Sequence, residues 1–132
     1  MTKRLNSNAR FALGDNNGAI ADYDKSIELK NTEPWLVSTN RGNARRALGD
    51  NNGAIADYDQ AIKLKPDYAT AYFIRGNTRL DLGDNNGAIA DYDQAIKLKP
   101  DYATAYNGRG NARFALGDNN GAIADYDQAI KL

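Results

Sequence analysis

The sequence contains no cysteine and no histidine among its 132 residues. Their absence excludes disulfide bonds, thiolate nucleophiles, imidazole bases and the usual zinc sites built from these ligands. The three serines, Ser7, Ser26 and Ser38, therefore have no histidine to activate them. We expect neither enzymatic activity nor a bound metal or cofactor.

An excess of one charge and long apolar runs are also missing. The 17 lysine and arginine residues balance 17 aspartate and glutamate residues, so the formal net charge is zero. Binding to nucleic acid usually needs a basic face, and so does attachment to a membrane surface, so neither partner is expected. No apolar run approaches the roughly 20 residues of a membrane-spanning helix. No signal-peptide pattern follows Met1, so a cytoplasmic location is the default expectation.

What the sequence has in abundance is repetition. The string Gly-Asp-Asn-Asn-Gly-Ala-Ile-Ala-Asp-Tyr-Asp begins at Gly14, Gly49, Gly83 and Gly117, with spacings of 35, 34 and 34 residues. Such a period indicates stacked supersecondary units, each of which buries its apolar face against its neighbours. We expect one array over residues 1–132, with repeats at approximately 1–33, 34–68, 69–102 and 103–132.

Each repeat shows the apolar periodicity of two helices. Ala54, Tyr58, Ala61 and Ile62 recur at i, i+4, i+7 and i+8, which predicts one buried stripe on a second helix. On a first helix, the corresponding face is marked by three residues: Tyr72, Gly76 and Leu82.

The predicted turns carry capping residues. Gly83 should end the first helix, and either Asp84 or Asn85 should cap the second helix that follows it. Pro66 marks the other turn, with Asp67 as the candidate N-cap of the next helix.

These residues resemble the tetratricopeptide repeat pattern, in which an aromatic, two small residues, alanines, a second aromatic and a proline follow at fixed spacing. The matching residues of one repeat are Tyr72, Gly76, Gly83, Ala88, Tyr92, Ala95 and Pro100. The resemblance covers essentially the whole chain. It implies an all-α solenoid of four helix-turn-helix repeats that winds into a right-handed superhelix.

Arginines depart from that pattern on the first helices, where the family usually has large apolar residues. They lie one position before the small glycine (Arg41, Arg75, Arg109) and three positions after it (Arg45, Arg79, Arg113). A buried charge is costly unless it is paired. We expect the aliphatic stems to pack while the guanidinium groups reach aspartates of the second helices; an anion-binding arginine row is the alternative.

The aspartates themselves do not form a catalytic pair. Asp57 and Asp59, like their copies in the other repeats, are two residues apart on a helix and so point in different directions. The Asp15-Asn16-Asn17-Gly18 turn also lacks the glycine and glutamate positions of a calcium loop. We interpret it as helix-capping chemistry.

One asparagine recurs on each first helix and forms the candidate binding row of Asn8, Asn43, Asn77 and Asn111. In the tetratricopeptide family, the first helices line a concave groove and such an asparagine binds the backbone of an extended peptide. Alternatively, these asparagines were copied with the repeat and only face water.

By position, the groove also includes Thr39, Phe73 and Asn107. Arg4, Asn8 and Asn40 match half of the family's clamp for a peptide carboxylate, whereas Thr70 and Ile74 replace its remaining cations.

The last repeat is not followed by a polar capping helix in this sequence. Its second helix has an apolar face formed by Ala122, Ile123, Tyr126, Ala129 and Ile130. An uncovered face on a repeating unit favours end-to-end association of two copies.

Two functions remain open. The near-verbatim repeats favour a scaffold without a dedicated ligand, either designed or produced by recent amplification of one hairpin. The alternative is an adaptor that binds extended peptides of other proteins in its groove.

Overall fold

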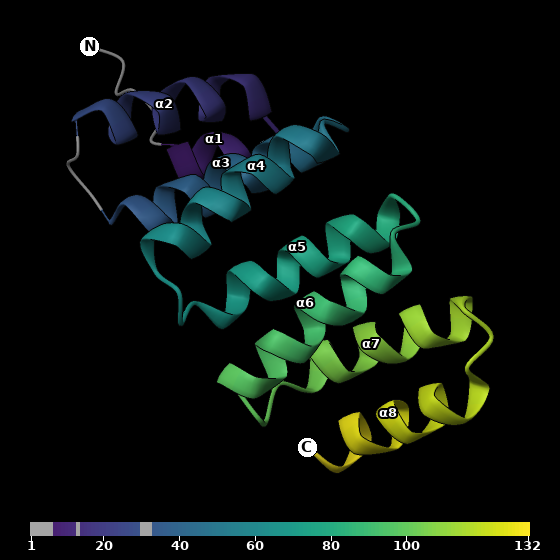
Figure 1. Cartoon of the computed structure of the whole chain (residues 1–132). Coiled ribbons are helices and arrows are strands. Elements are labelled where there is room, and N and C mark those ends of the chain that lie inside the picture. The colour runs from purple at the N-terminus through teal and green to yellow at the C-terminus, as the bar shows by residue number, and fades with distance from the viewer. Residues whose placement is uncertain (1–6, 13, 30–32) are drawn as a thin grey trace. The chain divides into compact units, whose positions relative to one another are not determined.

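The computed structural model describes residues 7–12, 14–29 and 33–132 (Figure 1). Within these ranges all regular secondary structure is helical, which confirms the expected all-α class. The helices are α1 (Ser7–Ala12), α2 (Asn16–Leu29), α3 (Pro34–Ala47), α4 (Asn51–Leu64), α5 (Ala69–Asp81), α6 (Asn85–Leu98), α7 (Ala103–Ala115) and α8 (Asn119–Lys131). None of these helices is both long and apolar enough to cross a membrane.

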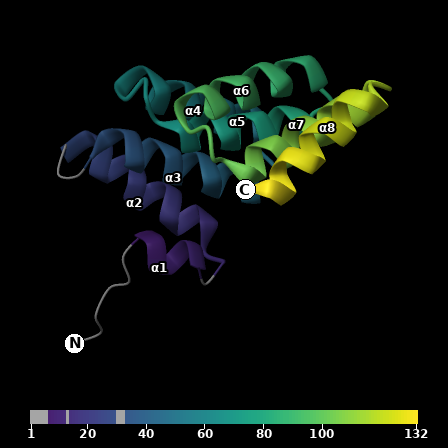
Figure 2. The same cartoon turned by 90° about the horizontal axis from the view of Figure 1, so that it is seen from below.

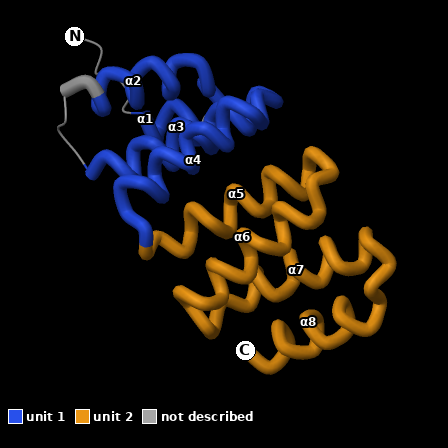
Figure 3. The backbone as a smooth tube through the Cα atoms, in the orientation of Figure 1, with its two compact units in different colours: residues 1–66 blue, residues 67–132 orange. Residues whose placement is uncertain are grey.

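The helices form two compact units, residues 1–66 with α1–α4 and residues 67–132 with α5–α8 (Figure 3). Within each unit, consecutive helices pack as antiparallel hairpins, as the two cartoon views show (Figures 1 and 2). The pairs α3–α4, α5–α6 and α7–α8 are such hairpins, and α2–α3 and α6–α7 join successive hairpins. The continuous array over residues 1–132 stays a prediction.

The turn inside each hairpin is built from a glycine and an aspartate. Gly49 has a φ of 84°, the left-handed conformation that glycine adopts without steric cost. The Gly49 amide donates to the Arg46 carbonyl at 2.9 Å, and the Asp50 amide donates to the Arg45 carbonyl at 2.9 Å. Asp50 then caps α4 by accepting from the Gly53 amide at 2.9 Å. One pair of residues therefore ends one helix and starts the next.

In the second, third and fourth hairpins, a tyrosine of the second helix packs on a glycine of the first. A Cβ added to Gly42 would lie 2.7 Å from the Tyr58 ring, and one on Gly76 would lie 3.0 Å from the Tyr92 ring. Tyr58 and Tyr92 are both fully buried. The glycine is needed because it lets the two helix backbones approach over the ring.

The predicted stripe on the second helices is confirmed, since Ala54, Tyr58 and Ala61 are buried. Leu82, in contrast, was wrongly placed on the core face of a first helix. It is the C-cap residue of α5 and is largely exposed, because the chain there already turns away from the core towards Gly83.

The predicted cap at Asp67 is also wrong. α5 begins at Ala69 with Tyr68 as its N-cap residue and no side-chain hydrogen bond at the cap. The equivalent Tyr102 at α7 shows why: its ring stacks on Phe73, with ring centroids 4.9 Å apart. Packing of the tyrosine, and not a polar cap, sets the start of that helix.

Candidate functional site

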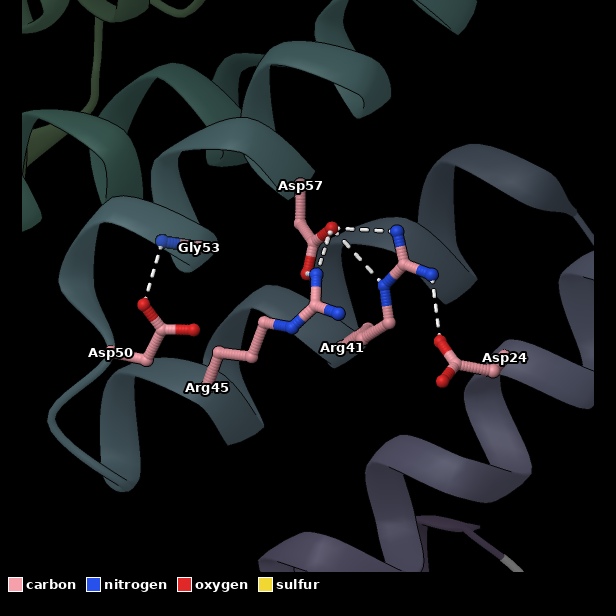
Figure 4. Close-up of polar contacts among 6 residues, drawn as sticks. All are labelled: Asp24, Arg41, Arg45, Asp50, Gly53 and Asp57. Atoms are coloured by element: carbon pink, nitrogen blue, oxygen red, sulfur yellow. Dashed lines mark hydrogen bonds and ion pairs between the residues drawn. The ribbon is translucent and has the colours of Figure 1, made fainter.

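Arginines of the first helix hold a buried aspartate of the second helix in three of the hairpins. In the second repeat, Asp57 of α4 lies between two guanidinium groups of α3 (Figure 4). Arg41 donates through Nη2 at 2.6 Å and Nε at 3.1 Å, and Arg45 donates through Nη1 at 2.9 Å. The same geometry recurs around Asp91 (from Arg75 and Arg79) and Asp125 (from Arg109 and Arg113). The predicted pairing of the arginines is thereby confirmed.

Arg41 and Arg109 also bond to an aspartate of the preceding repeat. Arg41 donates to Asp24 of α2 at 2.7 Å, and Arg109 donates to Asp93 of α6 at 2.9 Å. The hydrogen bond to Asp125 raises the pKa of Arg109 above its ordinary value, against the opposing effect of burial. These guanidinium charges are thus neutralised within the fold, which argues against the alternative of an anion-binding row.

The recurring asparagines also have partners inside the fold. Each accepts a hydrogen bond at Oδ1 from the tyrosine hydroxyl of its own hairpin. The four pairs are Tyr23 to Asn8 (2.7 Å), Tyr58 to Asn43 (2.7 Å), Tyr92 to Asn77 (2.6 Å) and Tyr126 to Asn111 (2.6 Å). A buried tyrosine needs such a partner for its hydroxyl, so the row has a structural role that the sequence analysis missed. No sequence signal singles out this pairing, because every pair of positions keeps a constant separation in repeats that are nearly identical.

This hydrogen bond fixes which end of each carboxamide is available. Because Oδ1 faces the tyrosine, the Nδ2 donors lie on the opposite side of the planar amide group. Asn8 and Asn111 are exposed, while Asn43 and Asn77 are half-buried. The Oδ1 acceptor of each of these asparagines is therefore already used within the fold.

Two pockets lie along the α1 and α3 helices of the first unit. One, of about 340 Å³, brings Asn8 and Asn40 together, with Asn40 Nδ2 3.5 Å from Asn8 Oδ1; its lining also includes Ser7, Tyr23, Ser26, Leu36 and Val37. The other, of about 410 Å³, is lined by Phe11, Asn43, Arg46 and Ala47. The α3 residues Asn40, Asn43 and Ala47 are three and four positions apart, so they share one helix face.

The remaining candidate groove residues are placed differently. Thr39 is buried, and its hydroxyl donates to the Trp35 carbonyl at 2.8 Å. Phe73 packs against Tyr92 and Tyr102 in the core of the second unit. Asn107 is exposed on α7. Arg4 lies outside the residues that the structure describes.

The apolar face predicted on the last helix is only partly exposed. Ala122 is buried in its own hairpin, and Tyr126 and Ala129 are half-buried. Ile123 is 58% exposed and Ile130 is 83% exposed. Two isoleucines therefore remain on the outer surface of α8.

The acidic residues do not gather into a metal site anywhere in the described part of the chain. Asp57 and Asp59 illustrate the reason, because the first is buried against arginines and the second is exposed. Carboxylates two residues apart on a helix cannot share one ligand.

The sequence matches family models of known proteins over most of its length. A model described as "TPR repeat" matches residues 42–83 and 76–117, and one described as "Tetratricopeptide repeat" matches residues 103–132. No curated protein matches the chain at a significant level.

Several solved structures are similar to the chain. The crystal structure of MamA is 26% identical, with a TM-score of 0.88 over 95% of this chain and 72% of MamA. The TPR domain of Arabidopsis OM64 is 33% identical, with a TM-score of 0.73 over 74% of this chain and 81% of that domain. The first TPR of Spaghetti (RPAP3), solved with the HSP90 peptide SRMEEVD, is 29% identical, with a TM-score of 0.77 over 84% and 87% of the two chains.

Proposed function

Because the chain belongs to the tetratricopeptide repeat family, we propose that it is a non-enzymatic protein-interaction scaffold that binds an extended peptide along α1 and α3. The observation that carries this proposal is the fixed orientation of the asparagine amides. Asn8 and Asn43 have their oxygens engaged by tyrosines, so their Nδ2 groups are free to donate to peptide carbonyls.

The two pockets along α1 and α3 suit alternate side chains of such a peptide. An extended segment gains affinity from backbone hydrogen bonds, and pockets add selectivity. The pocket at Asn8 and Asn40 has no charged residue in its lining, whereas the pocket at Phe11 and Ala47 has Arg46 in its lining. We infer that an apolar residue with an acidic neighbour suits the second pocket. The peptide complex of the first Spaghetti TPR supports this choice of ligand class.

A calorimetric titration with the peptide SRMEEVD tests the proposal, once with a free C-terminal carboxylate and once with an amide. We expect binding of the free acid. Asn43→Asp should weaken it by about five- to tenfold, because it removes two donors and adds a negative charge while keeping the oxygen that Tyr58 needs. Asn119→Asp is the matched control, since it adds the same charge at the exposed start of α8.

Absence of heat from both peptides would favour the second hypothesis, a scaffold without a dedicated ligand. Residues 48–72 and 82–106 have identical sequences, which supports this hypothesis, since recent amplification or design of one hairpin produces such copies. Equal binding of the acid and the amide would keep the adaptor but remove the carboxylate from its recognition.

We also propose that two copies of the chain associate through the exposed part of α8. Residues 83–97, which include most of α6, recur unchanged as residues 117–131, which include α8. The surroundings of α6 therefore indicate which kind of surface would cover the apolar face of α8. Ile89 and Ile96 of α6 are partly buried in the core cluster beside α7, whereas Ile123 and Ile130 of α8 are exposed. A helix from a second copy would bury these two side chains.

A further inference from the structure

Five asparagines in this chain are followed directly by glycine. Four of these steps start the second helices, at residues 17–18, 52–53, 86–87 and 120–121, and the fifth lies inside α7 at residues 107–108. An asparagine side chain is most open to attack by the next backbone nitrogen when that residue is glycine, because no Cβ hinders the approach. The chain therefore repeats the same chemically labile step in four copies of one local structure.

The reaction at such a step is deamidation. The glycine amide nitrogen loses its proton and attacks the asparagine Cγ; the new N–C bond forms, the bond from Cγ to Nδ2 breaks, and ammonia leaves. Water from the solvent then opens the resulting five-membered succinimide at either carbonyl. The products are aspartate, or isoaspartate with one extra methylene in the main chain, and no electrons are gained or lost.

In the second helix of each hairpin, the glycine amide that would act as the nucleophile already donates a hydrogen bond. The amides of Gly18, Gly53, Gly87 and Gly121 donate to the Oδ1 atoms of the capping aspartates at 2.9 to 3.0 Å. The hydrogen bond holds the proton that must leave, and the helical first turn keeps the amide away from the asparagine Cγ. The asparagine side chains themselves are exposed, so water reaches them once the turn opens.

We propose that Asn17, Asn52, Asn86 and Asn120 are spontaneous deamidation sites and that the aspartate cap before each one controls its rate. The cap bonds the amide of the same glycine that makes the asparagine labile: the Gly121 amide donates to Asp118 Oδ1 at 3.0 Å. The cap therefore acts directly on the nucleophile of the reaction. This inference does not rest on the proposed peptide binding.

The fold predicts an order among the sites. α6 packs against both α5 and α7, whereas the described contacts of α8 are with α7. The first turn of α8 should open more readily, so Asn120 should react faster than Asn86 although their neighbours in sequence are the same. Asn107 should be the slowest, because Gly108 lies inside α7 against the Tyr92 ring.

The products differ in their effect on the helix. Aspartate at the second helical position adds a negative charge near the helix N-terminus, which is favourable. Isoaspartate lengthens the main chain within the first turn, which breaks the spacing of its hydrogen bonds. Accumulation of isoaspartate should therefore loosen the modified hairpin.

The test is a time course of the full chain at mildly alkaline pH, followed by tryptic digestion and mass spectrometry. Cleavage after arginine and lysine gives a different peptide for each of the four steps at the helix starts: residues 11–25, 47–63, 80–97 and 114–131. The fifth step, at Asn107, lies in residues 98–109. The mass gain on converting amide to acid then reports each site separately. The isolated peptide of residues 114–131 gives the rate without tertiary structure.

Asp118→Ala should raise the rate at Asn120 about fivefold, because loss of such a cap shifts the opening of the first turn by about that factor. The other three sites in the same molecule should keep their rates, which controls for global unfolding. Asp118→Ser retains a capping oxygen without the charge, and it should stay close to the original rate.

The inference is overturned if Asn120 reacts as fast in the folded chain as in the isolated peptide. It is also overturned if Asp118→Ala leaves the rate at Asn120 unchanged, or if Asp118→Ser accelerates it as much as alanine does. The last result would assign the protection to the charge of Asp118 and not to its hydrogen bond.

Discussion

Replacing Asp125 with alanine measures how much a buried carboxylate contributes to its hairpin. The Asp125 side chain is 4% exposed and accepts from Arg109 Nη2 at 2.7 Å and from Arg113 Nη1 at 2.7 Å. Removing one partner of a buried ion pair typically costs about 3–5 kcal/mol. The two arginines are 17% and 29% exposed, and Arg109 keeps Asp93 at 2.9 Å, so water and this second carboxylate compensate in part. We expect a loss of about 3 kcal/mol in the free energy of unfolding, at the low end of that range.

Urea unfolding followed by circular dichroism measures this loss, with Asp127→Ala as the matched control. Asp127 is an exposed aspartate on the same helix, and its replacement should change stability by less than about 0.5 kcal/mol. The double variant Asp125→Leu with Arg109→Leu should recover much of the loss, because a buried ion pair is often replaceable by apolar side chains. The reasoning is refuted if Asp125→Ala costs no more than Asp127→Ala.

Two other predictions follow from single contacts. Tyr23→Phe should lower stability at neutral pH by about 1 kcal/mol in urea unfolding, because it removes the hydrogen bond of 2.7 Å to Asn8. Burial, and secondarily the charge of Asp22, raise the pKa of Tyr23 above its ordinary 10.0. Its stabilising contribution is therefore complete below pH 10 and is lost as the pH rises through the folded pKa, so Tyr23→Phe should make the alkaline loss of stability less steep. Ile130→Glu should shift sedimentation towards the monomer, and an unchanged chain that stays monomeric at high concentration contradicts association through α8.

The parts of the structure that depend on local chemistry could be predicted from sequence. A glycine followed by aspartate at the end of an apolar stripe has one low-energy use, as a helix end followed by an N-cap. Asp84 confirms this, since it caps α6 through the Gly87 amide at 3.0 Å. The pairing of Arg41 with Asp57 was predictable for a similar reason, because an arginine at a core position must find a carboxylate.

The parts that depend on packing between helices were harder to predict. The role of Asn43 as the acceptor for Tyr58 needs the two helices to lie at a particular rotation, which periodicity does not specify. Thr39 has the spacing of a groove residue but is buried, because its hydroxyl can bond back to the Trp35 carbonyl within the helix. Leu82 is apolar yet exposed, because the left-handed glycine that follows it turns the chain away from the core.

If the chain binds a peptide as proposed, specificity has to come from residues that differ between the copies. The constant residues are engaged by the fold itself: arginines hold aspartates, asparagines hold tyrosines, and aspartates hold glycine amides. One position on the first helices has no constant residue and is occupied in turn by Phe11, Arg46, Leu80 and Phe114. Phe11 and Arg46 line the same pocket, and Phe114 is largely exposed. Exchanging residues at this position between repeats should therefore change the proposed peptide binding, with less effect on stability than any change at the arginine, asparagine or aspartate positions.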